Sequence, residues 1–237
     1  ARREYSLQAT FQPEAERPLQ GDAIEAESES SERLPAAQPP VVWLFSGLAL
    51  GYSRLVLLDH WITHYLALGV DPERFILVVH HPPDVDEGIF LATLSLIDRR
   101  GVAAPVLKWT EPWSTQLIYM AYLDALRKAG VQYKDWILHA DADEFLVLPH
   151  PAEVSRKMSE HDLPIPVGEV LGNFSKAGVN AVPGFLVDRV ARDGSLRAVQ
   201  PFHSIWEQYP LDCPLTLAVG HANVRKIAAY RGYLRTC

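Results

Sequence analysis

The sequence predicts an α/β domain, built on a mostly parallel sheet with helices on both faces. Short apolar runs and helical patterns alternate four times within about 110 residues, starting at residue 41. The apolar runs are nearly continuous, which is typical of parallel strands that are covered on both sides. Right-handed crossovers between such strands place a ligand crevice at their carboxyl ends, so we look for function there.

The elements follow in a regular order along the chain. Strands are predicted over residues 41–45, 74–80, 104–109 and 136–139, the first of them closing at Ser46 and Gly47. Helices are predicted over residues 54–68, 86–97 and 112–128. The first helix has apolar side chains at helical spacing, namely Leu58, Trp61, Ile62, Tyr65 and Leu66. Gly69 and Gly130 stand where helix-ending glycines are expected.

Residues 1–40 differ in composition from the remainder of the chain. They contain eight acidic and four basic side chains and are rich in Glu, Ser, Pro and Ala. They lack periodic apolar residues that could offset the entropy of ordering, so we predict a flexible acidic stem. Residues 41–237 then form the domain. The net charge of −7 argues against a general nucleic-acid binder, which needs a basic surface.

The strongest chemical signal is the run Asp141-Ala142-Asp143-Glu144-Phe145 after the fourth predicted strand. In an extended chain, Asp141 and Asp143 project to the same side, because side chains alternate with a period of two. Two neighbouring carboxylates suit a hard divalent cation such as Mn²⁺ or Mg²⁺. Glu144 would point the other way, toward a backbone amide or an arginine. A solvated acidic turn is the competing interpretation, and the position after a buried strand favours the metal site.

Four segments in order resemble one family. The D-x-D-E-F string resembles the signature of GT-A-fold glycosyltransferases, in the branch related to families 2 and 92. The segment Trp61-Ile62-Thr63-His64-Tyr65, with Gly69-Val70-Asp71, is similar to the first helix of that branch. Residues 184–189 and the basic residues Lys226 and Arg231 resemble its later segments. The resemblance spans residues 41–237 and implies a GT-A-like, Rossmann-like fold.

The resemblance implies a metal-dependent enzyme. It would move a sugar from a nucleoside diphosphate sugar, with a UDP-sugar as the first expectation, to the hydroxyl of a glycan or glycoconjugate, with inversion. Asp141 and Asp143 would hold Mn²⁺ or Mg²⁺, and Asp141 would also contact the donor. The metal would neutralise charge on the departing diphosphate. Members of that branch continue past the basic segment into a histidine-bearing tail, and we expect that this tail is either absent or lies beyond Cys237.

An inverting enzyme also needs a carboxylate that accepts the proton of the attacking hydroxyl. The second half of the chain offers three candidates, Glu207, Asp188 and Asp212. We favour Glu207, because it lies in an aromatic stretch around Trp206 that could stack on a sugar. Asp188 directly precedes Arg189, and an ordinary ion pair between them is the competing interpretation.

Several further residues are candidates for donor or metal binding. Lys226 and Arg231 could contact the diphosphate, with solvated surface cations as the alternative. His203 and His221 are candidate third metal ligands, since imidazole also suits Mn²⁺. Asp84 follows the second predicted strand, and the resemblance places such a residue near the nucleotide base.

The sequence also leaves two alternative functions open and indicates a cellular location. A haloacid-dehalogenase-type phosphatase also uses D-x-D after a strand, but three strands precede the motif here and Phe145 departs from its pattern. A catalytically inactive relative that binds a glycan or a partner protein is the other alternative. The stem and the Asn173-Phe174-Ser175 sequon fit the Golgi lumen, with a membrane anchor upstream of Ala1, and a bacterial cytoplasm is the alternative.

Overall fold

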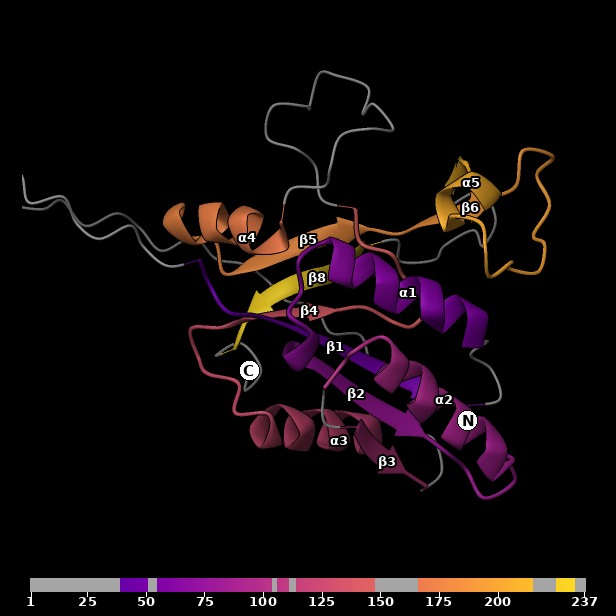
Figure 1. The fold of residues 1–237 in the computed structure, drawn as a ribbon. Helices are drawn as coiled ribbons and strands as arrows, with labels where there is room; N and C mark the ends of the chain where they lie inside the picture. Colours follow the sequence, from indigo (N-terminus) through magenta and orange to yellow (C-terminus); the bar gives the residue numbers. More distant parts are fainter. Residues whose placement is uncertain are drawn as a thin grey trace, which may run out of the picture. The chain divides into compact units, whose positions relative to one another are not determined.

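A computed structural model describes residues 39–50, 55–103, 106–110, 114–147, 166–214 and 225–232. The central element is a six-stranded sheet with the strand order β3-β2-β1-β4-β8-β5 (Figure 1). Its strands are β1 (Val42–Ala49), β2 (Phe75–His80), β3 (Val106–Trp109), β4 (Trp136–His139), β5 (Ala181–Phe185) and β8 (Arg225–Arg231). A separate two-stranded sheet pairs β6 (Val187–Val190) with β7 (Leu211–Pro214).

The direction of the strands confirms the prediction of a mostly parallel sheet. Strands β1 to β4 pair in parallel through β1–β2, β1–β4 and β2–β3. Strand β8 is antiparallel to both of its neighbours, β4 and β5. All strands of the sheet except β8 therefore run in the same direction. The carboxyl ends of β1, β2, β3 and β4 lie at the same end of the sheet.

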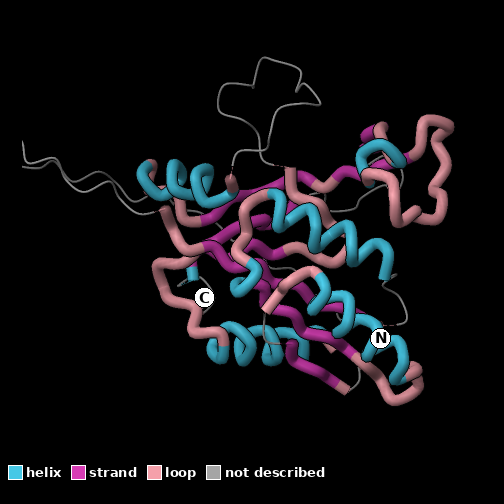
Figure 2. Tube along the Cα trace, viewed as in Figure 1, coloured by secondary structure: helices cyan, strands magenta, loops and turns pink. Residues whose placement is uncertain are grey.

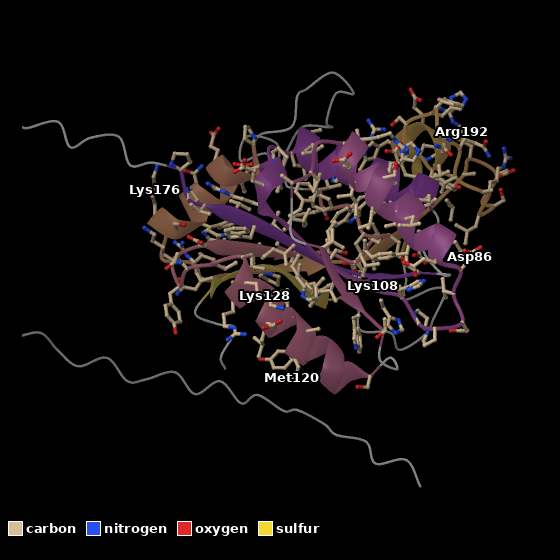
Figure 3. The ribbon with its side chains drawn as sticks, turned by 60° about the horizontal axis from the view of Figure 1, so that its bottom comes forward. Asp86, Lys108, Met120, Lys128, Lys176 and Arg192 are labelled. Carbon is tan, nitrogen blue, oxygen red and sulfur yellow. The ribbon has the colours of Figure 1, made fainter. Side chains whose placement is uncertain are left out.

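Helices cover both faces of this sheet, as predicted (Figure 2). The helices are α1 (Leu55–Ala67), α2 (Glu87–Arg99), α3 (Thr115–Lys128), α4 (Val167–Lys176) and the one-turn α5 (Ile205–Gln208), with a 3₁₀ turn at Pro72–Arg74. Buried residues of α1, α2 and α4 pack in one core cluster, and those of α3 pack in another. Met120, on the outer side of α3 (Figure 3), is 62% exposed.

Strand β2 shows why the two cores form. Phe75, Leu77 and Val79 belong to the cluster under α1 and α2, whereas Ile76 and Val78 belong to the cluster under α3. Adjacent side chains of a strand point to opposite faces, so a continuous apolar run supplies both cores. Apolar burial of this kind is the main favourable contribution to folding.

The first strand is longer than the sequence predicted. Ser46 and Gly47 do not close β1, because the backbone continues to pair with β2 as far as Ala49 opposite His80. Parallel pairing, which the local sequence does not encode, overrides the turn propensity of these two residues. The predicted second strand and the second helix differ from β2 and α2 by no more than two residues at either end.

The edges of the six-stranded sheet are β3 and β5. Strand β3 is four residues long and carries Lys108, and β5 carries Pro183. The register between β5 and β8 shifts between Val182 and Pro183, which marks a bulge. Proline lacks a backbone N–H and is tolerated at edges and bulges. The bulge lies next to Lys226, which pairs with Gly184.

None of the helices within the described ranges is both long and apolar enough to span a bilayer. The predicted stem lies outside the described residues except for Pro39 and Pro40. The division of the chain at residue 40 therefore stays a prediction.

Candidate active-site cleft

The run Asp141–Glu144 forms a tight turn directly after β4. The Glu144 amide donates to the carbonyl oxygen of Asp141 over 2.9 Å. The Asp141 amide in turn donates to Oε2 of Glu144 over 2.9 Å. Ala142 is buried, while Asp141 and Asp143 are exposed. The expectation of an extended chain here is wrong, because β4 ends at His139, but the predicted contact of Glu144 with a backbone amide is confirmed.

Lys226 of β8 closes this turn from the side. Its Nζ atom lies 2.5 Å from Oε2 of Glu144 and 3.2 Å from Oδ2 of Asp141. The ammonium group thus pairs with both carboxylates, and Glu144 does not point away from Asp141 as the sequence suggested. The structure places Lys226 beside the acidic motif, and its predicted contact with a diphosphate stays a prediction.

Helix α1 fixes the backbone that follows the turn. The buried hydroxyl of Tyr65 donates to the carbonyl oxygen of Glu144 over 3.1 Å and accepts from the Leu146 amide over 3.2 Å. His64 Nε2 lies 2.9 Å from the carbonyl oxygen of Leu146. The two motifs that carried the resemblance are therefore in direct contact, although about 80 residues separate them. Tyr65 was predicted as an apolar residue of the first helix and as part of the Trp61–Tyr65 motif, but the sequence did not indicate its hydrogen bonds to the turn.

A cleft of about 580 Å³ lies between the D-x-D-E-F segment and the small two-stranded sheet. Its lining includes Asp143, Glu144, Asp188, Arg189, Trp206 and Lys226. The acidic motif lies at the carboxyl end of β4, where the topology rule places ligands. This volume lies within the range of ordinary small-molecule sites.

Arg189 and Trp206 build the opposite wall of the cleft. The guanidinium of Arg189 lies 4.7 Å from the centre of the Trp206 ring, and its Nε donates to the Tyr209 carbonyl oxygen over 2.8 Å. Its Nη1 is 2.7 Å from Oδ1 of Asp212. Arg189 therefore forms its ion pair with Asp212 and not, as the competing interpretation had it, with its neighbour Asp188. Asp212, the third candidate base, is therefore already paired.

The remaining candidate bases lie in different places. Asp188 is exposed on β6 and lines the cleft. Glu207, which the sequence analysis favoured, is exposed on α5 and is not part of the cleft lining. Its neighbour Trp206 faces the cleft instead, because consecutive helical side chains point about 100° apart. Of these two candidates, only Asp188 lines the cleft.

Three other predicted residues do not line the cleft, and a fourth lies outside the described residues. Arg231 pairs with Trp136 at the start of β4 and stacks on its ring at 4.8 Å. Arg231 is five residues further along β8 than Lys226, which corresponds to about 16 Å at the usual rise per strand residue. Arg231 therefore lies near the amino-terminal ends of the parallel strands, away from the acidic turn. Asp84 follows β2, which is two strands away from β4, and is not part of the cleft lining. His221 lies outside the described residues. His203 is exposed and does not line the cleft.

Burial shifts the pKa values of three groups around the D-x-D-E-F motif. Desolvation lowers the pKa of His64, although the Leu146 carbonyl partly opposes the shift. Desolvation, and then the charge of Lys226, lower the pKa of His139. Desolvation raises the pKa of Tyr65, and the charges of Glu144 and Asp141 add to that shift. Both imidazoles and the phenol are therefore held in their neutral forms near pH 7.

The charges in the cleft leave an excess of carboxylate. Arg189 is neutralised by Asp212, and Arg197 by Asp193, both from outside the cleft lining. Lys226 is shared between Glu144 and Asp141. Among the described residues, Asp143 and Asp188 take part in no ion pair. A diphosphate entering this cleft would therefore meet uncompensated negative charge.

These residues fit a divalent cation that arrives with a diphosphate. Within the described ranges, no three His, Cys, Asp or Glu side chains converge as a complete metal site. Mg²⁺ in phosphate-transfer sites, however, is usually held by one or two carboxylates plus phosphate oxygens. The exposed carboxylate of Asp143 is a donor of that kind, whereas Asp141 is not part of the cleft lining and lies 3.2 Å from the Lys226 ammonium.

Comparisons with known proteins add little to this description. No protein-family model and no curated protein matches the chain. The solved structure of a 4-diphosphocytidyl-2C-methyl-D-erythritol synthase is similar over 84% of this chain and 78% of that chain, with 13% identity and a TM-score of 0.36. A similarity this weak supports no conclusion about function. The function proposed below therefore rests on the residues of the cleft.

Proposed function

We propose that this protein is a metal-dependent glycosyltransferase that uses a nucleoside diphosphate sugar, with UDP-sugars first. One observation carries the proposal: Asp143 of the D-x-D turn lines the same cleft as Asp188, which forms no ion pair with any residue that the structure describes, next to the carboxyl end of β4. The acceptor would be the hydroxyl of a glycan or glycoconjugate. A Golgi-lumen location belongs to the same proposal.

The side chains have distinct roles in the proposed reaction. Asp143, with Asp141, would hold Mn²⁺ or Mg²⁺, which supplies charge neutralisation at the diphosphate. Asp188 accepts the proton of the acceptor hydroxyl as its oxygen bonds to the anomeric carbon and the bond to the diphosphate oxygen breaks. Lys226 is placed to pair with a phosphate oxygen of the leaving group. Trp206 and Leu196 line the cleft beside these polar groups.

The experiment is thermal unfolding with UDP plus Mn²⁺, with UDP plus EDTA, and with neither. A ligand at about 100 times its dissociation constant stabilises the folded state by roughly 2.7 kcal/mol. We expect a rise in Tm of roughly 5–10 °C that requires Mn²⁺. The rise should vanish in Asp143→Ala and persist in Asp98→Ala, which removes an exposed carboxylate of α2. No rise with UDP or with GDP would refute nucleotide-sugar binding.

A second candidate is a binding module that holds a nucleotide or glycan without turnover. The observation that favours it is the ammonium of Lys226, which already neutralises part of the acidic turn. Hydrolysis of a UDP-sugar separates the two candidates. An active transferase releases UDP slowly even without an acceptor, whereas a binding module releases none above the uncatalysed rate.

A further inference from the structure

The pairing of Lys226 poses a problem for metal binding. Its ammonium lies 3.2 Å from the Asp141 carboxylate that would help to hold a cation. A divalent cation on Asp141 and an ammonium at that distance repel each other strongly. One of the two must give way when the other binds.

The two ion pairs of Lys226 are unequal. The contact with Glu144 is 2.5 Å long, and the side chains of both partners are little exposed, at 23% and 22%. The contact with Asp141 is longer, and the Asp141 side chain is 56% exposed. Exposed ion pairs are worth less than shielded ones. The contact with Asp141 is therefore the one that opens, while Glu144 keeps the lysine at the cleft.

We infer that Lys226 is an exchangeable counter-ion: it neutralises Asp141 before a divalent cation binds, and it turns its released N–H donors toward the donor diphosphate afterwards. This inference rests on the proposed function. Glu144 acts as the pivot, because it holds both the Lys226 ammonium and the Asp141 amide.

If Lys226 moves from Asp141 to the diphosphate, two binding affinities change in a way that differs from the effect of a lysine that only stabilises the turn. If the ammonium competes with the cation, then its removal strengthens the binding of Mn²⁺ alone. If the same ammonium then serves the diphosphate, its removal weakens the binding of UDP in the presence of Mn²⁺. The two affinities should therefore change in opposite directions. A lysine that only holds the turn together would weaken both.

The test compares wild type with Lys226→Met, which keeps the aliphatic length and removes the charge. Binding of Mn²⁺ alone is measured by electron paramagnetic resonance, and binding of UDP at saturating Mn²⁺ by calorimetry. We expect Mn²⁺ to bind about two- to five-fold more tightly to the variant, the worth of one partly exposed ion pair. We expect UDP to bind about ten- to a hundred-fold more weakly, because a charge-assisted hydrogen bond is lost.

A control variant guards against a folding defect. Lys108→Met removes a lysine that pairs with Glu87 over 3.0 Å outside the cleft lining (Figure 3), and it should change neither affinity. Melting temperatures show that each variant is folded.

The outcomes separate this inference from the function on which it rests. Opposite changes in the two affinities support exchange. Weaker binding of both ligands, or no change in either, overturns exchange while leaving the proposed function in place. If wild type binds neither Mn²⁺ nor UDP, the proposed function fails, and the inference fails with it.

Discussion

Replacement of Tyr65 by Phe removes one oxygen atom from the contact between α1 and the acidic turn. The ring of Tyr65 is fully buried, so Phe fills the same space. The lost hydroxyl makes two hydrogen bonds, of 3.1 Å to the Glu144 carbonyl oxygen and 3.2 Å from the Leu146 amide. Each such bond contributes about 1 kcal/mol net, and a buried partner left without one costs somewhat more. We expect the free energy of unfolding to fall by about 2 kcal/mol.

Urea denaturation and thermal melting measure this loss. For a chain of this size, about 2 kcal/mol lowers Tm by roughly 4–8 °C. The matched control is Thr63→Val on the same helix, because the exposed Thr63 hydroxyl only donates to the Asp59 carbonyl oxygen four residues earlier. That change should stay within about 0.5 kcal/mol of wild type. A loss below about 0.5 kcal/mol for Tyr65→Phe would show that the hydroxyl does not hold the turn.

Two further predictions concern catalysis and pH. If Asp188 is the base, Asp188→Asn lowers glycosyl transfer by about 10²–10⁴-fold with little effect on UDP affinity, and Glu207→Gln stays within about ten-fold; the reverse order in a transfer assay would restore Glu207. Because burial lowers the pKa of both His64 and His139 from the ordinary 6.5, the unfolded chain binds more protons below that pH. Stability is therefore full above pH 6.5 and falls as the pH drops toward the lowered values. Urea titrations between about pH 7.5 and 5.5 should show this slope, and His139→Gln should flatten it; an unchanged slope would contradict the assignment.

The strands and helices that the sequence predicted share one property. Between residues 41 and 139, β1, β2 and β4 are mostly buried apolar runs, and α1 and α2 bury residues at helical spacing, so period and burial coincide there. The strands after residue 180 lack that signal. β5 contains Pro183, Ile227 of β8 is 54% exposed, and the adjacent Val187 and Asp188 of β6 are both exposed. Half-exposed strands of this kind, whether at an edge like β5 or inside the sheet like β8, have no pattern that distinguishes them from loops.

The site was predictable where it depends on a single strand. Asp141 and Asp143 follow β4, so the rule for parallel sheets located them. Lys226 and Arg231 depend on β8, which enters the sheet between β4 and β5 in the opposite direction. Antiparallel entry brings Lys226 to the acidic turn and sends Arg231 away from it. The local sequence does not contain this pairing, because 85 residues separate Lys226 from Asp141.

Glu207 shows a second limit of prediction from the sequence, which is the direction of a side chain on a short helix. The sequence placed it beside Trp206, and both lie on α5 as neighbours. Which of two consecutive residues faces a cleft depends on how the single turn of helix is docked. Here Trp206 contacts Phe145 and His64, with ring centres 6.0 and 5.6 Å apart. That aromatic contact fixes the rotation of α5 and leaves Glu207 outside the cleft lining.

Both margins of the six-stranded sheet discourage recruitment of another chain. A free strand edge is a template on which a second molecule can add its own strand, and this is a common route to aggregation. At one margin, β3 is too short for extended pairing and carries Lys108. At the other, Pro183 has no N–H to offer a newcomer, and the bulge beside it bends the ladder. Self-association of this domain, if it occurs, is therefore expected to use helical surfaces and leave the sheet closed at six strands.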